Sequence, residues 1–380
     1  MKAGKKHDRR GIRDLPPSTV ILGIVALVVV PRVLLFVTGL AASAEHSGQE
    51  LDDAATAMWH HWDPGHYLRI ADVGYLSSGE DALFIVFFPL FPLLVAGAGL
   101  VLRNVTVASL VVTTAASIAS GFLLYRLVRL DHPEGQARGA VVLLFAFPTA
   151  YALFAPYSEA VFLAAVLGSV YAARTGRWWL AGLAGMAATA TRIVGLALVP
   201  ALLVEAFLAQ RGDGRGPRKL LAIGLVPLGF AAYLGINQVV HGDPLHFLQV
   251  QEDHWYQRMV APWTPVTDAI EAMRGAELTV ETFLVHPARL LAIAFAVAVL
   301  AVGWRSLRAT DRVFSAATVL MVLSASWLIS LPRYLLAIYP LFTTMGALGR
   351  RRALLWAAAA LCFVLQVLLF SRFARGMWAF

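Results

Sequence analysis

Long apolar runs separated by short polar segments dominate the chain. Within the runs, Leu, Ala, Val and Gly are intermixed, and polar and apolar residues do not alternate as they do in strands. A helical run of about 20 apolar residues crosses the ~30 Å hydrocarbon core of a bilayer. The pattern therefore predicts an all-α fold, a polytopic bundle of transmembrane helices.

The predicted spans number about twelve, and several are shorter than the roughly 20 residues that a crossing needs. They cover 19–40, 83–102, 105–128, 139–156, 158–173, 178–191, 193–210, 219–240, 283–303, 313–331, 334–349 and 353–371. Residues 1–18 then form a basic cytoplasmic tail, 19–371 a single transmembrane domain, and 372–380 a C-terminal tail. The run 19–40 is too long for the core of a signal peptide, so we expect a retained first span.

Composition agrees with a membrane protein, since 59% of residues are hydrophobic and only 14% are charged. The net charge of +8 is also typical of proteins that bind nucleic acid. The Lys and Arg residues, however, form short clusters at the ends of apolar runs, as the positive-inside rule predicts for cytoplasmic loops. We therefore expect a bilayer and no nucleic acid as the partner. Cys362 is the only cysteine, which excludes a disulfide framework.

Charge also orients the chain. The loops 41–82 and 241–282 are rich in Asp and Glu and poor in Lys and Arg, so we expect both to be extracytoplasmic. One conflict arises: two crossings between 83 and 128 would place the basic segment 129–138 outside. Either part of 83–128 is a half-span or re-entrant segment, or the charge rule fails there.

The first acidic loop contains the stretch HHWDPGHY, followed by LRIADVGY. Asp63 before Pro64 reads as a helix start, with Asp63 as N-cap, and Gly74 reads as the end of that helix. The apolar face of this helix, Tyr67, Ile70, Ala71 and Tyr75, suits the membrane interface. Asp63 is then a cap, a general base at the membrane surface, or both.

A metal site in this loop has to be weighed as well. His60, His61 and His66 with Asp63 or Asp72 are chemically suited to zinc or manganese. The spacing of His61 and His66 is poor for one helical face, and no metal signature is present. We expect no metal and no cofactor.

Further polar residues interrupt the apolar runs. Glu159, in FAPYSEAVF, needs a partner or a water-filled cavity, unless it lies at the interface where Ser158 caps the next helix. Arg192 lies within a long apolar run, and Arg333 and Tyr334 follow the helix-breaking Pro332. Snorkelling explains both arginines, and so does binding of a lipid phosphate.

The second acidic loop, HGDPLHFLQVQEDHW, repeats the Asp-Pro helix start at Asp243. Gln251, His254 and Trp255 follow, and these polar and aromatic residue types bind sugars. A solvated helix face is an equally good explanation of the stretch.

Six stretches together resemble a family. In order, WDPGHYLRIADVGY, FFPLFPLL, FPTAYALFAPYSEAVFLA, ATRIVGLALVP, GDPLHFLQVQ and LPRYLLAIYPLF are similar to segments of PIG-V-type mannosyltransferases, which belong to the GT-C class of polytopic glycosyltransferases. The resemblance extends over roughly residues 20–345.

The resemblance implies an inverting mannosyltransferase that takes mannose from a polyprenyl-phosphate donor on the outer face of the cell membrane. It implies a catalytic acid at Asp63, a second acid at Glu159, and arginine-bearing motifs at Arg192 and Arg333. Trp62, His66 and Tyr67 join the residues of the second acidic loop as candidate sugar or acceptor contacts. The short loops and Ala-rich composition look bacterial, so the acceptor stays open among glycans, glycolipids and glycoproteins.

Two other functions fit parts of the pattern. A transporter or flippase could use Glu159 and Arg192 to line a path. A membrane scaffold would leave the acids, arginines and aromatics on one side unexplained. Convergence of Asp63, Glu159, Arg192 and Arg333 on one cavity would favour the enzyme.

Overall fold

The computed structural model describes residues 18–209, 216–275, 277, 279–326 and 328–380. Over these residues the chain is helical and contains no strand, only one isolated antiparallel bridge between Met259 and Ala325. The predicted all-α class is confirmed. Almost all of the predicted basic tail, 1–17, and part of the basic segment 211–219 lie outside the described residues.

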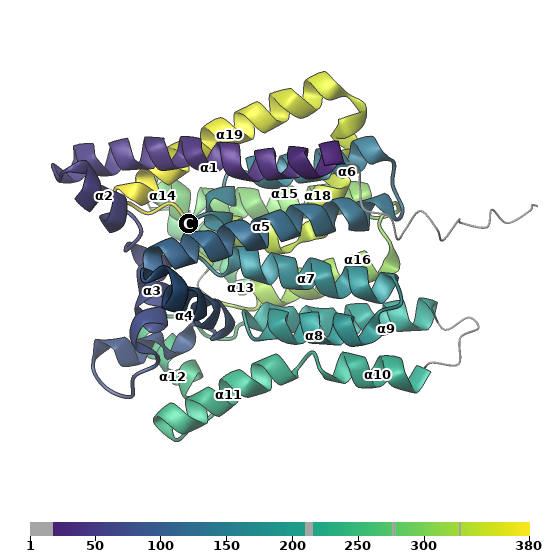
Figure 1. Cartoon of the computed structure of the whole chain (residues 1–380), viewed down its shortest axis with the longest axis horizontal. Coiled ribbons are helices and arrows are strands. Elements are labelled where there is room, and N and C mark those ends of the chain that lie inside the picture. Colours follow the sequence, from purple (N-terminus) through teal and green to yellow (C-terminus); the bar gives the residue numbers. More distant parts are fainter. Residues whose placement is uncertain (1–17, 210–215, 276, 278, 327) are drawn as a thin grey trace, which may run out of the picture.

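Most of the helices run side by side along the long axis of the molecule (Figure 1). They are α1 (Ser18–Ser47), α5 (Val105–Arg129), α6 (Glu134–Ala146), α7 (Glu159–Arg174), α8 (Trp178–Thr189), α9 (Leu198–Leu208), α10 (Gly216–Gly224), α11 (Leu228–His241), α15 (Pro287–Gly303), α16 (Ala309–Leu323) and α19 (Arg352–Ala374).

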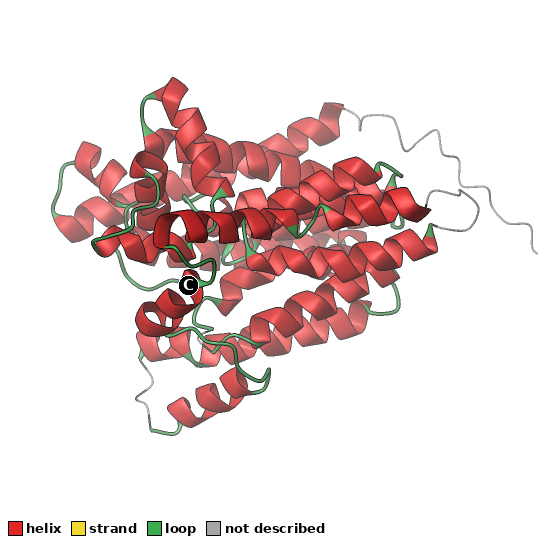
Figure 2. Ribbon diagram, turned by 90° about the horizontal axis from the view of Figure 1, so that it is seen from below, coloured by secondary structure: helices red, strands yellow, loops and turns green. Residues whose placement is uncertain are grey.

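Shorter helices gather at one end of the bundle, at the left of Figure 1, which we term the loop end. These are α2 (Leu51–Ala57), α3 (Trp62–Val73), α4 (Leu90–Leu102), α12 (His246–Trp255), α13 (Thr264–Met273) and α14 (Val280–Val285). The other end, where α5 ends and α19 begins, is termed the basic end. Nearly all connections are short turns (Figure 2), so neighbours in sequence are also neighbours in space.

Within the described residues, five helical segments are long and apolar enough to cross a membrane. They are Ser18–Ser47, Val105–Arg129, Gly216–His241, Val280–Gly303 and Arg352–Ala374. The remaining helices of the bundle are shorter than a full crossing, which agrees with the prediction that several spans need help from their neighbours.

The charge conflict in 83–138 has a structural answer. The 3-10 helix η1 (Glu80–Val86) and α4 meet at a bend of 117°, which marks a broken or re-entrant segment. Helix α4 stays at the loop end beside α3, and α5 then runs to the basic end (Figure 1). The basic segment after Arg129 therefore lies at the same end as Ser18, and the charge rule holds.

Three other predicted spans, 313–331, 334–349 and 139–156, are wrong as continuous helices. Helix α16 ends at Leu323, and the chain continues as short pieces: α17 (Leu331–Tyr334), η4 (Leu335–Ala337), α18 (Tyr339–Met345) and η5 (Gly346–Arg350). Proline lies in the first turn of both α17 and α18, where its missing N–H costs nothing, but it cannot continue a preceding helix. Likewise 139–156 ends its α-helix at Ala146, before Pro148.

A buried arginine connects the first helix to the centre of the bundle. Arg32 of α1 is only 8% exposed. Its guanidinium donates to Leu153 O at 2.6 Å and to Ser117 Oγ at 2.7 Å, and it lies over the Phe154 ring. Charge-assisted bonds of this kind satisfy a buried cation without a carboxylate. They fix η2 (Ala150–Leu153), the segment that leads to Glu159.

Candidate functional site

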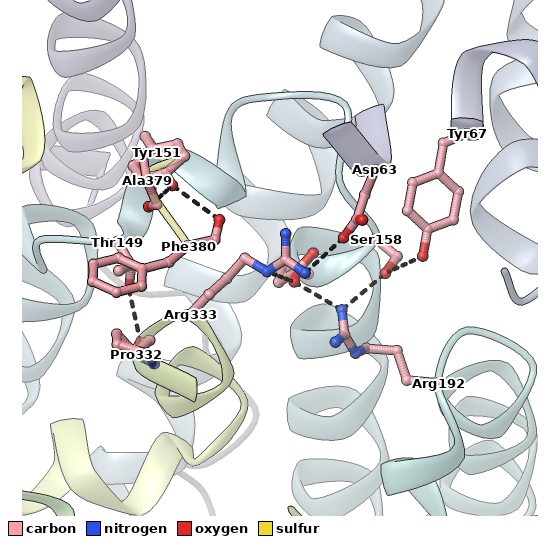
Figure 3. Close-up of polar contacts among 11 residues, drawn as sticks. Asp63, Tyr67, Thr149, Tyr151, Ser158, Arg192, Pro332, Arg333, Ala379 and Phe380 are labelled. Carbon is pink, nitrogen blue, oxygen red and sulfur yellow. Dashed lines mark hydrogen bonds and ion pairs between the residues drawn. The ribbon is translucent and has the colours of Figure 1, made fainter. Parts of the chain in front are cut away.

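Four charged side chains from distant parts of the sequence meet at the loop end (Figure 3). The guanidinium of Arg333 contacts two carboxylates: Nη2 donates to Asp63 Oδ2 at 2.7 Å, and Nε lies 3.0 Å from Glu159 Oε1 in an ion pair. Arg192 Nη1 donates to the same Glu159 oxygen at 2.8 Å. Two cations and two anions thus form one neutral cluster, which we call the charged cluster.

The chain breaks around Pro332 place Arg333 in the cluster. Helix α17 has a single turn, and Thr149 Oγ1 donates to the Pro332 carbonyl at 3.0 Å. The guanidinium of Arg333 lies 4.3 Å from the centre of the Tyr157 ring, a cation–π contact. Its side chain is 5% exposed, so Arg333 does not snorkel into solvent.

Glu159 has an uneven environment. Its Oε1 atom contacts the guanidinium groups of both arginines. Its Oε2 atom is buried and has no hydrogen-bond partner among the described residues. A buried carboxylate oxygen normally has a partner, because losing its water without replacement costs about 1–3 kcal/mol or more. Glu159 is also one of the residues that line a cavity beside the cluster.

The predicted caps are not formed. Helix α3 begins two residues earlier than expected, at Trp62 instead of Pro64, and the preceding residue His61 caps it without a side-chain hydrogen bond. The Asp63 side chain is in the first turn, where the helix dipole favours a carboxylate, and it turns to Arg333 instead of its own backbone. The predicted end at Gly74 is confirmed, with φ 77°.

Ser158 also does not cap α7 with its side chain. Its Oγ atom accepts from the Tyr67 hydroxyl at 3.0 Å and from Arg192 Nη1 at 3.2 Å. The hydroxyl therefore connects α3 to the charged cluster. Burial raises the pKa of Tyr67 far above its ordinary value, so Tyr67 stays a neutral donor.

The backbone directly before Asp63 is strained. Trp62 has φ 58°, in the left-handed region that bulky L-residues rarely adopt. Gly65, one turn on, has no room for a side chain, since a Cβ there would lie 2.6 Å from the His60 carbonyl oxygen. The tight entry into α3 therefore sets where Asp63 points.

A cavity of about 380 Å³ opens beside the charged cluster. Ten of the predicted residues line it: Trp62, Asp63, His66, Tyr67, Glu159, Arg192, Gln251, Trp255, Arg333 and Tyr334. Much of the remaining lining is apolar, including Met321, Val322, Leu328, Ile329 and Ala337 from α16 and the segments after it. The cavity lining therefore has a charged part and an apolar part.

Two predicted residues do not line this cavity. Asp243 does not start a helix: α12 begins at His246, and the Asp243 carboxylate accepts from Leu245 N at 2.9 Å in a local turn. His254 is exposed on α12. Gln251 and Trp255 of the same helix do line the cavity, because residues four apart share one face.

An aromatic wall joins α3 to α12. The His66 ring packs against Phe84 at 4.3 Å, Phe87 at 5.2 Å and Trp255 at 5.4 Å between centroids. Burial lowers the pKa of His66, partly offset by the negative charges of Asp63 and Asp81, so the imidazole is neutral at pH 7. A neutral ring can both donate and accept a hydrogen bond.

Trp378 was not among the site residues predicted from the sequence. Residues 375–380, which we expected only as a tail, fold back so that Trp378 lines the cavity and contacts Trp62. The one available signal was an aromatic pair, Trp378 and Phe380, after the last apolar run. Within the described residues, no three His, Cys, Asp or Glu side chains gather closely enough to hold a metal ion.

No protein-family model matches the sequence. Over 154 residues the chain is 33% identical to human GPI alpha-1,6-mannosyltransferase 2, an alignment that covers 38% of this chain and 30% of that relative. The chain thus matches less than a third of the relative's length.

Two crystal structures of one oligosaccharyltransferase from Archaeoglobus fulgidus are similar in shape. The structure tethered to an acceptor peptide has a TM-score of 0.42 at 14% identity, over 92% of this chain and 55% of that one. The complex with zinc and sulfate has a TM-score of 0.43 at 13% identity, over 91% and 53%. At such scores the similarity bears neither on activity nor on the residues of the site.

Proposed function

We propose that this chain is an integral-membrane glycosyltransferase that moves a hexose, mannose by resemblance, from a polyprenyl-phosphate donor to an acceptor hydroxyl. The observation that carries the proposal is the convergence of Asp63, Glu159, Arg192 and Arg333 on one cavity. The local identity to a mannosyltransferase supports the same reading. The acceptor is a glycan, glycolipid or glycoprotein.

The cavity suits a lipid-phosphate sugar. Arg192 is the more accessible arginine, with 21% of its side chain exposed against 5% for Arg333, so it meets an incoming phosphate first. The apolar lining from α16 and the segments after it suits the first isoprene units of the lipid. Guanidinium groups bind phosphate oxygens through paired N–H bonds.

The proposed transfer step uses three of these side chains. The Asp63 carboxylate takes the proton of the acceptor hydroxyl as its oxygen attacks the anomeric carbon from the side opposite the phosphate. The bond between the anomeric carbon and the phosphate oxygen breaks, and polyprenyl phosphate leaves with the electron pair. Arg192 and Arg333 stabilise the charge that grows on the leaving phosphate. Configuration at the anomeric carbon inverts.

The proposal also includes the side of the membrane on which the site lies. The loop end, which holds the site, is opposite the end that holds the basic segment after Arg129, and by the positive-inside rule this arrangement supports a site on the extracytoplasmic face of the cell membrane. A lipid-linked donor can reach that face through the bilayer, whereas a nucleotide sugar stays in the cytoplasm.

The test is transfer of labelled mannose from polyprenyl-phosphate mannose by membranes that contain the wild type or Asp63→Asn. The substitution keeps size and removes the basic carboxylate. We expect the transfer rate to fall at least ~10²-fold, the usual share of a general base.

Asp72→Asn is the matched control, because Asp72 is exposed on the same helix and does not line the cavity. It should transfer at the wild-type rate. A wild-type rate in a well-folded Asp63→Asn variant would remove Asp63 as the base. If the wild type transfers no mannose, the proposed donor is wrong, and transport assays test the alternative function.

A further inference from the structure

Apart from Arg333 Nε, which forms an ion pair with Glu159, three buried polar atoms of cavity-lining residues lack a hydrogen-bond partner among the described residues. They are Glu159 Oε2, Trp255 Nε1 and Trp378 Nε1. Buried polar atoms of folded proteins are nearly always paired, so each such exception needs an explanation. One acceptor and two donors match a ligand that carries several hydroxyl groups, since a hydroxyl both donates and accepts.

Contacts of the C-terminal segment fix the position of Trp378 in the lining of the cavity. Gly376 has φ 72° and turns the chain back against His61, whose ring lies so close that a Cβ on Gly376 would be 3.1 Å from it. Arg372 Nε donates to the Trp378 carbonyl at 3.2 Å. The Tyr151 hydroxyl donates to the carbonyls of Ala379 and Phe380 (Figure 3).

Trp62 and Trp378 meet edge to face, with ring centroids 5.2 Å apart and an interplanar angle of 89°. In this arrangement the ring that presents its edge keeps both faces outside the contact. One face of a pyranose carries several C–H bonds and packs on such an aromatic face, while its hydroxyl groups reach polar atoms at the rim. The pair therefore offers an apolar platform beside the unpartnered indole N–H of Trp378.

The exposed fractions of the side chains indicate whether the acceptor or the donor contacts the Trp62–Trp378 pair. Trp62 is 41% exposed and the Asp63 side chain 29%, whereas Glu159 and Arg333 are at most 6% exposed. A hydroxyl that approaches from solvent thus reaches Asp63 along Trp62 and Trp378. The donor phosphate and its lipid belong to the deeper, arginine-bearing and apolar side.

We infer that Trp62 and Trp378 form an acceptor subsite for a sugar ring, in which the Trp378 indole N–H donates to a ring hydroxyl. The inference rests on the proposed transfer reaction, because it names the class of acceptor: a carbohydrate with an exposed pyranose, rather than a protein hydroxyl or a simple lipid alcohol. Trp378 is then a specificity-determining residue.

The test uses the full chain in lipid nanodiscs, which avoids detergents with sugar head groups. Binding of methyl α-D-mannopyranoside is titrated by saturation-transfer NMR, with glycerol as a polyol that lacks a ring. We expect Trp378→Phe, which keeps a ring and removes the N–H, to weaken binding about 2- to 10-fold, the usual effect of one hydrogen bond. Trp378→Ala should weaken it further, and glycerol should not bind.

Trp356→Phe is the matched control, since Trp356 is 57% exposed on α19 and does not line the cavity. It should bind as the wild type does. Unchanged binding in Trp378→Phe and Trp378→Ala, or no binding by the wild type, overturns the inference. So does displacement of the glycoside by saturating polyprenyl-phosphate mannose, which would assign the platform to the donor sugar. Failure of mannose transfer with intact glycoside binding would contradict the proposed function alone.

Discussion

Two buried glutamates, one near each end of the bundle, differ in how they are satisfied. Glu205 of α9, near the basic end, is 4% exposed, and both of its oxygens are bonded: Arg308 donates to them at 2.9 and 2.8 Å, and Thr310 Oγ1 donates to Oε2 at 2.6 Å. Glu159, at the loop end, is 6% exposed, yet one oxygen contacts two arginines and the other has no partner among the described residues.

The difference separates a structural contact from a binding site. A fork of two parallel bonds, as between Glu205 and Arg308, is the arrangement that best offsets burial of both charges. It ties α9 to the start of α16 and does not line the cavity. The Glu159 contacts leave one oxygen without a partner in a residue that lines the cavity. Equal burial therefore does not mean equal function, and the unused bonding capacity distinguishes the two.

Neutralising each glutamate in turn should give the largest difference between the two sites. Glu159→Gln removes the charge that holds Arg192 and Arg333 together, so we expect mannose transfer to fall ~10²-fold, in the range of a lost electrostatic contact in an active site. Glu205→Gln should instead lower the free energy of unfolding by about 1–3 kcal/mol, less than for a fully buried pair because Arg308 is one-third exposed.

Transfer rates per folded protein and thermal unfolding in the same nanodiscs measure both effects. The comparison is wrong if Glu205→Gln loses transfer as strongly as Glu159→Gln does. It is also wrong if Glu159→Gln only loses stability.

Replacing the arginine partners by lysine should also affect the two sites differently. Arg333→Lys keeps the charge but cannot reach Asp63 and Glu159 from two separate nitrogens in a fixed plane. We expect transfer to fall roughly 10- to 100-fold, mainly in kcat, because the carboxylates move apart. Arg308→Lys at the basic end should leave kcat within about twofold of the wild type, and it is the control. Equal kcat values for the two variants would contradict a positioning role for Arg333.

The smallest expected effect concerns the backbone before the site. Gly65→Ala forces the first turn of α3 away from the His60 carbonyl and so shifts Asp63. We expect transfer to fall about tenfold, since sub-ångström misplacement weakens catalysis. Gly235→Ala in α11 is the control, because nothing lies within 4 Å of a Cβ there. Steady-state transfer assays separate them, and equal rates would show that the position of α3 does not limit the reaction.

Periodicity and charge were enough for the architecture. The all-helical class, the end of α3 at Gly74 and most helix positions follow from apolar runs, Gly and Pro, which act locally. The basic clusters left open either a broken segment in 83–128 or a failure of the charge rule, and the 117° bend in the structure favours the broken segment. Helix starts were less certain, because Asp63 and Asp243 each had a competing bond that the sequence did not reveal.

The candidate site, too, could be predicted only in part from the sequence. A charge or an aromatic in an apolar chain is conspicuous in the sequence, so Asp63, Glu159, Arg192 and Arg333 could be named from the residues and the resemblance they carry. Their pairing could not, because Asp63 and Arg333 are 270 positions apart and meet only when the bundle closes. The unpartnered oxygen of Glu159, the strained Trp62 and the place of Trp378 depend on that same closure. The residue types alone show which groups must find partners within the bilayer, since burying them is costly. Which of them satisfy one another, and which remain available to a ligand, depends on how the folded chain brings distant segments together.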